Sequence, residues 1–300
     1  MLTIRLHKIK KEFEIKLMTK IFNDIQFKRF TPEYEQQLAT THGNIPFKTI
    51  LSMRCEYITD LIIKNHHKVI PKILHGEIET SSITVLSEKY KLPPIALLKI
   101  SLSKNGYSAQ DIHNILHEIP TSQPITDVYR RQVNEAIAND GFTIIDNKQQ
   151  LANSLNFEKD IQNILENLGV TYKTQDELTA EQIKTHGKPI STPDFLITSN
   201  LTINGRKIHW IDAKNYYLSC FPFTVNKIKG QTKKYIDLYG YGAIIASCGV
   251  CDDLKVNGVM MIPYDDIVEY GIRSSSNTSS NTISSTVTSI NMDDISTTDI

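Results

Sequence analysis

The stretches that decide the fold are Thr192-Pro-Asp-Phe-Leu-Ile-Thr198 and Lys207-Ile-His-Trp-Ile-Asp-Ala-Lys214. Both are mainly apolar and predict β-strands. Asp194 opens the first strand, while Asp212 and Lys214 are two residues apart in the second, so their side chains leave the same face of the sheet. Because ionisable residues are rare in such strands unless they are paired or bind a metal, these three are the candidate chemical centre.

A hairpin turn at Asn204-Gly205 joins the two strands. A strictly paired two-residue turn there would place Asp212 opposite Ile197, whose side chain points away from the face used by Asp194. We therefore predict an irregularity that realigns the two aspartates, in the form of a bulge, a bend at Ser199-Asn200 or a longer loop.

Two carboxylates that converge on one point repel each other, and a hard divalent cation removes that repulsion. Phosphodiester hydrolysis uses the same groups, with a lysine that orients water or offsets developing charge. We therefore expect Asp194, Asp212 and the Ala213 carbonyl to hold Mg²⁺ or Mn²⁺ and Lys214 to orient or activate the attacking water. The competing interpretation is a buried ion-pair network.

The elements around these strands predict a mixed sheet. A helix over Leu155–Leu168 ends at Gly169 and precedes a strand at Val170–Tyr172. After the hairpin, a helix over Val225–Leu238 precedes two apolar strands, at Tyr241–Ser247 and Gly258–Ile262. The fold class that this order favours is α+β or α/β.

The pattern Thr192-Pro193-Asp194 followed by Asp212-Ala213-Lys214 resembles the PD-(D/E)xK signature of restriction-endonuclease-like nucleases. More narrowly, Thr-Pro-Asp-Phe together with His209-Trp210-Ile211 resembles the codanin-interacting nuclease family, roughly from Pro32 to Pro263. The resemblance implies a Holliday-junction-resolvase-like core behind helix-turn-helix modules. It also implies Mg²⁺ or Mn²⁺ as the cofactor, DNA or RNA as the substrate and a codanin-like protein as a partner. The location that it implies is the nucleus, and also the cytoplasm. Asp212 departs from the family, in which Glu is frequent at this position.

The resemblance also implies two further site residues. Glu158, on the helix before the strands, would complete the metal shell, with Glu166 as the rival. Gln231, on the helix after them, would steady the phosphate or water. The competing interpretation of Glu158 and Gln231 is an ordinary helix surface.

Local charge favours a polyanionic partner. The chain has no net charge, but the segment 206–234 holds seven basic residues and one acid. We expect the following residues to contact a nucleic-acid backbone: Arg206, Lys227, Lys229, Lys233 and Lys234. A solvated helix face is the alternative for these lysines. A nucleic-acid-binding adaptor without turnover is the alternative for the whole protein.

Four segments follow from composition and pattern. We expect a basic, flexible arm over residues 1–30, with eight basic residues against three acidic ones. A helical domain over 31–145 contains a helix-turn-helix-like pair around Lys91-Leu-Pro-Pro94. For the third segment, 146–272, the resemblance implies a nuclease domain with a restriction-endonuclease-like mixed sheet flanked by helices. The Ser/Thr/Asn-rich segment 273–300 predicts disorder.

The four cysteines are too sparse for a disulfide framework and favour a reducing compartment. Cys248 and Cys251 have the spacing of half a zinc site, but no second pair or nearby histidine completes it, so we interpret them as buried thiols. Because charge interrupts every apolar run, we expect no membrane span.

Overall fold

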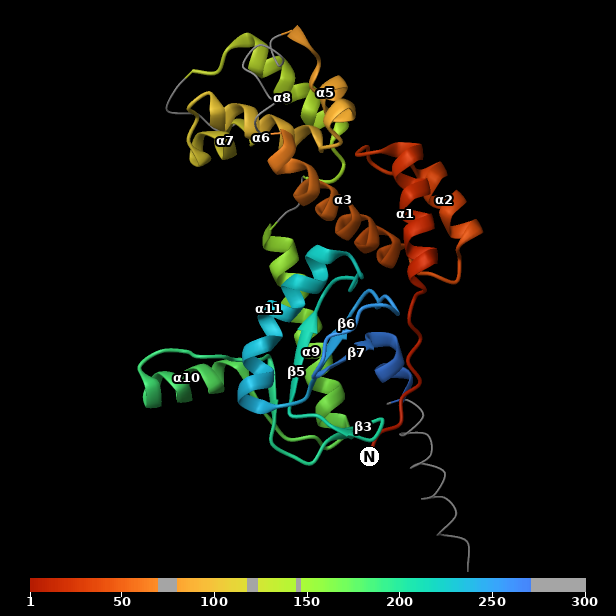
Figure 1. The fold of residues 1–300 in the computed structure, drawn as a ribbon, viewed down its shortest axis with the longest axis vertical. Helices are drawn as coiled ribbons and strands as arrows, with labels where there is room; N and C mark the ends of the chain where they lie inside the picture. Colours follow the sequence, from red (N-terminus) through yellow and green to blue (C-terminus); the bar gives the residue numbers. More distant parts are fainter. Residues whose placement is uncertain (70–79, 118–123, 144–146, 271–300) are drawn as a thin grey trace, which may run out of the picture.

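The computed structural model describes residues 1–69, 80–117, 124–143 and 147–270. Helices dominate the first half and a mixed sheet lies in the second, which confirms the predicted fold class (Figure 1). The expected disordered tail, 273–300, lies outside the described residues. Within the described ranges, no helix combines the length and apolar character needed to span a membrane.

The sheet has five strands in the order β1-β2-β5-β6-β7. β1, β2 and β5 pair antiparallel, while β5, β6 and β7 run parallel. The strands are β1 Tyr172–Thr174, β2 Phe195–Ile197, β5 Trp210–Lys214, β6 Gly242–Ala246 and β7 Val259–Pro263.

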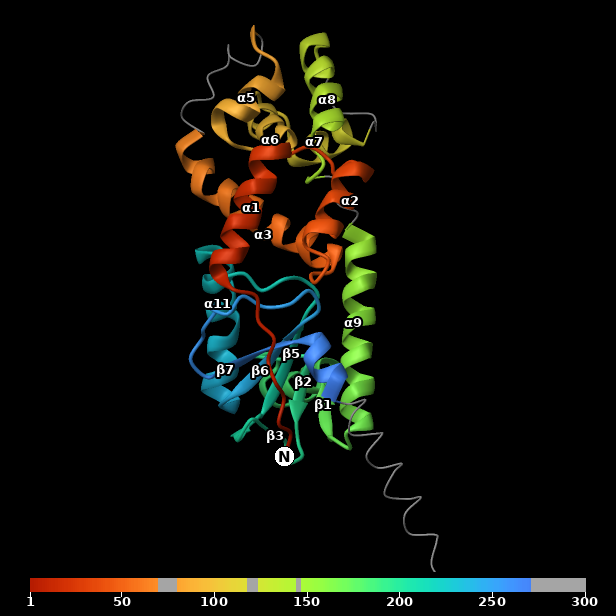
Figure 2. The ribbon, with the colours of Figure 1, turned by 90° about the vertical axis from the view of Figure 1, so that its right-hand side faces the viewer.

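Helices cover both faces of the sheet (Figure 2). α11, Pro222–Tyr239, lies over the face that carries Trp210 and Ile244, and α9, Asn147–Asn167, packs on the face that carries Ile211 and Ile245. Side chains alternate along a strand, so Asp212 and Lys214 share the face of Trp210 and lie under α11.

The predicted hairpin irregularity is present. The tip pairs β3, Thr202–Ile203, with β4, Arg206–Lys207, as a strict two-residue turn demands. Ile208 N–H donates to the Leu201 carbonyl at 2.9 Å, yet Ile197 N–H already donates to His209 at 2.9 Å. Residues 198–200 are therefore extra on one side, with a bend at Ser199.

The first half is helical, as expected. Its helices are α1 Lys11–Ile25, α2 Pro32–Thr41, α3 Phe47–Val69, α5 Ile83–Tyr90, α6 Pro94–Lys104, α7 Ala109–Leu116 and α8 Asp127–Asn139. The helix-turn-helix-like pair is α5 and α6, which a short turn starting with left-handed Lys91 joins.

The apolar cores do not separate at residue 145, where we expect the boundary between the helical domain and the sheet domain. α5, α6, α7 and α8 share a core of their own, centred on buried residues such as Leu97 and Leu98. α1, α2 and α3 instead share a core with α11 and the sheet, in which Met18 and Met53 pack with Trp210 and Ile244. Figure 1 shows α5–α8 at the end of the molecule remote from the sheet.

The expectation of a flexible basic arm over residues 1–30 is wrong. Leu17, Met18 and Ile21 form a buried stripe on α1, because their spacing places them on one helix face. Residues 1–10 form an extended strap along the core, where Leu2 bridges Ile203. The basic side chains of the segment project outward from this apolar stripe, so charge alone is a poor guide to order here.

The segment between β1 and β2 is polar, which favours a loop, but it forms the helix α10, Gln175–His186. Its N-terminus carries a capping box, in which the Thr174 hydroxyl accepts from Glu177 N–H and the Glu177 carboxylate accepts from Thr174 N–H. The helix ends at Gly187, whose φ of 74° few other residues adopt.

Candidate functional site

The two aspartates lie opposite each other where β2 and β5 separate. Phe195 pairs with Ile211, so the next positions outward, Asp194 and Asp212, are cross-strand neighbours on one face of the sheet. The Asp194 carboxylate accepts a 2.7 Å hydrogen bond from Ala213 N–H. The Asp194 carboxylate takes the place of a backbone carbonyl as the acceptor, because the paired part of β2 begins only at Phe195. The hydrogen bond therefore fixes the Asp194 carboxylate where the ends of β2 and β5 separate, a place that we call the strand mouth.

Ala213 faces Asp194 with its backbone. The Lys214 carbonyl accepts from Ser247 N–H on the β6 side, and carbonyls alternate along a strand, so the Ala213 carbonyl points to the β2 side. The peptide oxygen therefore lies on the same side of β5 as the Asp194 carboxylate, which suits its expected role as a ligand.

Asp212 is 1% exposed and forms an ion pair with Lys214, whose side chain is 12% exposed. Gln231 Nε2, on α11, lies 3.3 Å and 3.4 Å from the two Asp212 carboxylate oxygens and donates to them. Burial, with the nearby negative charge of Asp194, raises the pKa of Asp212 to about 7. Burial also raises the pKa of Asp194, against the opposing effects of the Ala213 hydrogen bond and Lys214.

Glu158 reaches the same electrostatic neighbourhood from α9. It is half-buried, and burial together with the charge of Asp194 raises its pKa. The rival Glu166 lies two turns further along the exposed side of the helix, where it accepts hydrogen bonds from Tyr172 and Gln162. The structure thus brings Glu158, and not Glu166, toward the aspartates.

The segment that leads into Asp194 is held by side chains that the sequence analysis missed. Gln182 on α10 accepts from Ile190 N–H at 2.6 Å and from Ser191 N–H at 3.1 Å, and it donates to the Ser191 carbonyl at 2.8 Å. The Tyr239 hydroxyl donates to the same carbonyl at 2.8 Å. The available signal was the capping box before α10, which predicts a helix around Gln182.

The expected phosphate-binding residues do not form one cluster. On α11, Lys227 and Lys234 are spaced to share the helix side of Gln231, at i−4 and i+3. Lys229 and Lys233 lie roughly 160° around the helix from Gln231. Arg206 lies at the hairpin tip, stacked over Tyr241 at 5.3 Å, next to the strand ends remote from Lys214. Lys227 and Lys234 are therefore the two lysines of α11 that share the helix side of Gln231, and the Lys227 ammonium lies over the Tyr216 ring at 4.7 Å.

A cavity of about 860 Å³ adjoins the site. α3 and α9 form its walls, and the residues after the ends of β5 and β6 contribute Asn215, Tyr216 and Ser247. Its lining is mostly uncharged and rich in amide, hydroxyl and aromatic groups. The buried Tyr216 hydroxyl, which has no hydrogen-bond partner in the described chain, is one of them.

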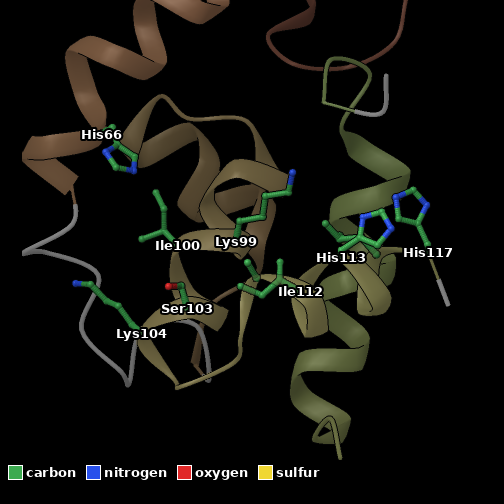
Figure 3. A pocket seen from close by; sticks show the side chains of 10 residues that line it. His66, Lys99, Ile100, Ser103, Lys104, Ile112, His113 and His117 are labelled. Atoms are coloured by element: carbon green, nitrogen blue, oxygen red, sulfur yellow. The ribbon is translucent and has the colours of Figure 1, made fainter. Parts of the chain in front are cut away.

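A second cavity, of about 580 Å³, lies on the remote helical unit (Figure 3). Lys99, Ile100 and Ile112 line it, with His66 on one side and His113 on the other. The lining residues that the structure describes include no acidic side chain, and the cavity belongs to a different part of the molecule from the aspartates.

The donors at the strand mouth fit a hard divalent cation. Asp194, Asp212, Glu158 and the Ala213 carbonyl offer oxygen atoms, which Mg²⁺ and Mn²⁺ prefer. The charge of Asp194 raises the pKa of both Asp212 and Glu158, and the charge of Glu158 also raises that of Asp212. A cation would offset this repulsion.

The motif at the start of β2 is Thr192-Pro193-Asp194, and a family model is built around it. Residues 126–265 match the TPD sequence-motif family. The family is described as "Protein of unknown function TPD sequence-motif". The TPD match runs from α8 to just beyond β7, so it contains Glu158, Asp194, Asp212, Lys214 and Gln231.

The chain is also similar to an uncharacterized protein of Acanthamoeba polyphaga mimivirus, with 33% identity over 120 residues. The alignment covers 39% of this chain and 42% of the viral protein, so the chain spans less than half of that relative's length. No solved structure matches the chain.

Proposed function

We propose that this chain is a nuclease of the PD-(D/E)xK type, which hydrolyses phosphodiester bonds of DNA or RNA with Mg²⁺ or Mn²⁺. The observation that carries the proposal is the pairing of Asp194 with Asp212 across two strands, with Lys214 on the same face. Asp212 is buried and its pKa is raised. Ionisable groups with strongly shifted pKa values are concentrated at functional sites, which supports a catalytic or metal-binding role for Asp212.

Each side chain has a role that follows from its position. Asp194, Asp212 and the Ala213 carbonyl would hold the cation, and Glu158 would complete its shell directly or through water. When bound, a divalent cation polarises a phosphoryl oxygen and makes water a better nucleophile. The Lys214 ammonium would orient that water and offset charge that develops on the phosphate, and the Gln231 amide would steady the phosphate or the water.

Binding of the polynucleotide would use the groups around the site. Lys227 and Lys234 lie on the Gln231 side of α11 and would contact backbone phosphates. The adjoining cavity offers amides, hydroxyls and rings, of which Asn215 and Tyr216 directly follow Lys214 in the chain. These groups suit the sugar and base of a nucleotide next to the cleaved bond.

The test is cleavage of single-stranded, duplex and branched DNA and of RNA by the full chain, with Mg²⁺ or Mn²⁺. We expect Asp194→Asn and Lys214→Ala to lower the cleavage rate by roughly 10²-fold or more. Lys207→Ala is the matched control, because Lys207 is an exposed lysine on the same hairpin, and its rate should stay within about threefold of the wild type.

Wild-type cleavage by Lys214→Ala would end the proposal. Binding of the substrates without turnover, with either metal, would instead favour the nucleic-acid-binding adaptor. The remote α5–α8 unit favours that second function, because a unit with its own core can present a surface to a codanin-like protein partner without disturbing the sheet.

A further inference from the structure

A second cluster of ligating side chains lies away from the aspartates. Glu14, in the first turn of α1, meets Cys220 and Cys251, and their ligand atoms all lie within 4.8 Å of one another. Sequence spacing associates Cys251 with Cys248, but the fold places it with Cys220, and Cys248 lines the large cavity. The thiol that lies beside Cys251 is therefore Cys220, and not Cys248 as the sequence spacing suggests.

Three separate parts of the chain build this cluster. The segment that continues from β5 carries Cys220, and its Leu218 bridges Val250, next to Cys251. Ile9, just before α1, bridges Cys251 itself. Since backbone pairing fixes each segment, the three side chains are brought together by the fold and do not meet through surface mobility.

The carboxylate of the cluster is held in one orientation. Glu14 and Cys251 are both 0% exposed. Tyr217 donates a 3.1 Å hydrogen bond to Glu14 Oε2, and Ser219 donates to Oε1. Ligating carboxylates are oriented by outer hydrogen bonds of this kind.

The electrostatics of the cluster favour a cation. Burial raises the pKa of Glu14, of Cys220 and of Cys251, and the charge of Glu14 raises the pKa of both thiols further. A cation among the three groups would offset the repulsion between their ionised forms. Two sulfur donors with one carboxylate suit a borderline-soft metal such as Zn²⁺ and do not suit Mg²⁺.

We propose that Glu14, Cys220 and Cys251 form a Zn²⁺ site that fastens α1 to the two segments beyond β5 and β6. The Cys220 and Cys251 thiols, and Glu14 where its carboxyl is protonated, release their protons to solvent, and the two thiolates and the carboxylate each donate an electron pair to the cation. Water takes the fourth position, on the side of half-exposed Cys220. The reaction needs no oxidant or reductant. It is independent of the proposed nuclease activity.

The experiment measures zinc bound by the full chain after equilibration with Zn²⁺ under reducing conditions and removal of free metal. We expect about one Zn²⁺ per wild-type chain. Cys220→Ser and Cys251→Ser should lose it, and Glu14→Gln should weaken binding at least tenfold. Cys55→Ser and Cys248→Ser are the matched controls, because their thiols lie outside the cluster, and they should keep the zinc. Asp212→Asn should keep it too, which separates this site from the proposed Mg²⁺ site.

If Cys251→Ser fails to fold, Co²⁺ absorption and the alkylation rate of Cys220 test the site in the wild type and in Cys220→Ser. Co²⁺ in place of Zn²⁺ should give the intense thiolate-to-metal absorption band in the wild type and not in Cys220→Ser. Zn²⁺ should also slow alkylation of Cys220 in the wild-type chain at least tenfold. Equal zinc content in the wild type and Cys220→Ser, or unchanged alkylation of Cys220, would overturn the proposal.

Discussion

Asp212 shows how one buried carboxylate couples stability to pH. Its pKa in the folded chain is raised from 3.8 to about 7, first by burial and then by Asp194. The folded state therefore binds this proton more tightly than the unfolded state does. The resulting stabilisation is fully present below about pH 4 and is lost as the pH rises through 7.

We therefore expect Asp212→Asn to become more stable relative to the wild type as the pH rises. In the absence of divalent metal, the difference in Tm between variant and wild type should grow from pH 5 to pH 8. The change corresponds to a few kcal/mol, about 1.4 kcal/mol for each pKa unit. Thermal melts across this range measure it. A difference that is constant with pH would mean that Asp212 titrates as an ordinary aspartate. The Lys214 ion pair forms only when Asp212 is ionised, and its opposing effect is already included in the raised pKa of Asp212.

Glu158 and Glu166 provide a comparison between two acids of one helix. Glu158→Gln removes a carboxylate that the charges of Asp194 and Lys214 influence, whereas Glu166→Gln removes one bonded to Tyr172 and Gln162. In the cleavage assay we expect the rate with Glu158→Gln to fall by about 10²-fold and the rate with Glu166→Gln to stay within about threefold of the wild type. The metal requirement should shift to higher concentration in Glu158→Gln only. Equal losses in both variants would remove Glu158 from the site.

At the scale of elements, α10 holds the segment that positions Asp194 at the end of β2. Gln182 holds the backbone of Ile190 and Ser191, four and three residues before Asp194. Gln182→Ala would leave the Ile190 and Ser191 N–H groups without this acceptor, at about 1–3 kcal/mol for each buried group, while the Ser191 carbonyl keeps its bond from Tyr239. The same loss would release the segment that positions Asp194.

We expect Gln182→Ala to lower kcat for cleavage by roughly tenfold to a hundredfold, because a displacement near 1 Å at a reacting group has an effect of this size. KM should change much less. Lys184→Ala is the matched control, since Lys184 is exposed on the same helix. Circular dichroism establishes whether the variant retains its helices, and Gln182→Glu, which keeps the acceptor for both N–H groups, should recover part of the rate. An unchanged kcat in Gln182→Ala would exclude a positioning role.

Element prediction succeeded where apolar periodicity dominates and failed where charge dilutes it. β5 and β6 were predictable because Ile211, Ile244 and Ile245 belong to short apolar runs with turn residues on either side. α10 was missed because its only two buried residues are Leu178 and Gln182, so no apolar stripe marks it. Its capping box was present in the sequence but depends on one Thr and one Glu.

The site was predictable in its centre and not in its surroundings. The need for an irregularity between Asp194 and Asp212 follows from strand alternation, and the extra residues 198–200 supply it. Their position at the base of the hairpin depends on tertiary contacts that sequence does not display. The lysines of α11 share one stretch of sequence, but helical rotation separates Lys229 and Lys233 from Gln231.

At the scale of the whole molecule, the separate core of α5–α8 predicts unfolding in more than one step. Leu98 is 0% exposed in that core, and Leu98→Ala should lower its stability by about 2–5 kcal/mol. Trp210 is the single tryptophan of the chain and lies in the other core, with Met18 and Ile244.

We therefore expect Leu98→Ala to advance the loss of helical circular dichroism while the Trp210 fluorescence transition stays in place. The reciprocal variant, Ile244→Ala, should move the fluorescence transition. Urea titrations followed by both probes measure the two effects. Coincident transitions that move together in Leu98→Ala would show that the two cores unfold as one unit.

The strap of residues 1–10 has a consequence for synthesis of the protein. His7 contacts Asp266 across 259 positions of sequence, through a backbone bond of 2.8 Å and a side-chain bond of 2.7 Å. During translation the strap leaves the ribosome roughly 10–50 s before Asp266 does, because 259 positions separate them. Until then the apolar stripe of α1 has no complete core to join, because part of that core belongs to α11 and the sheet.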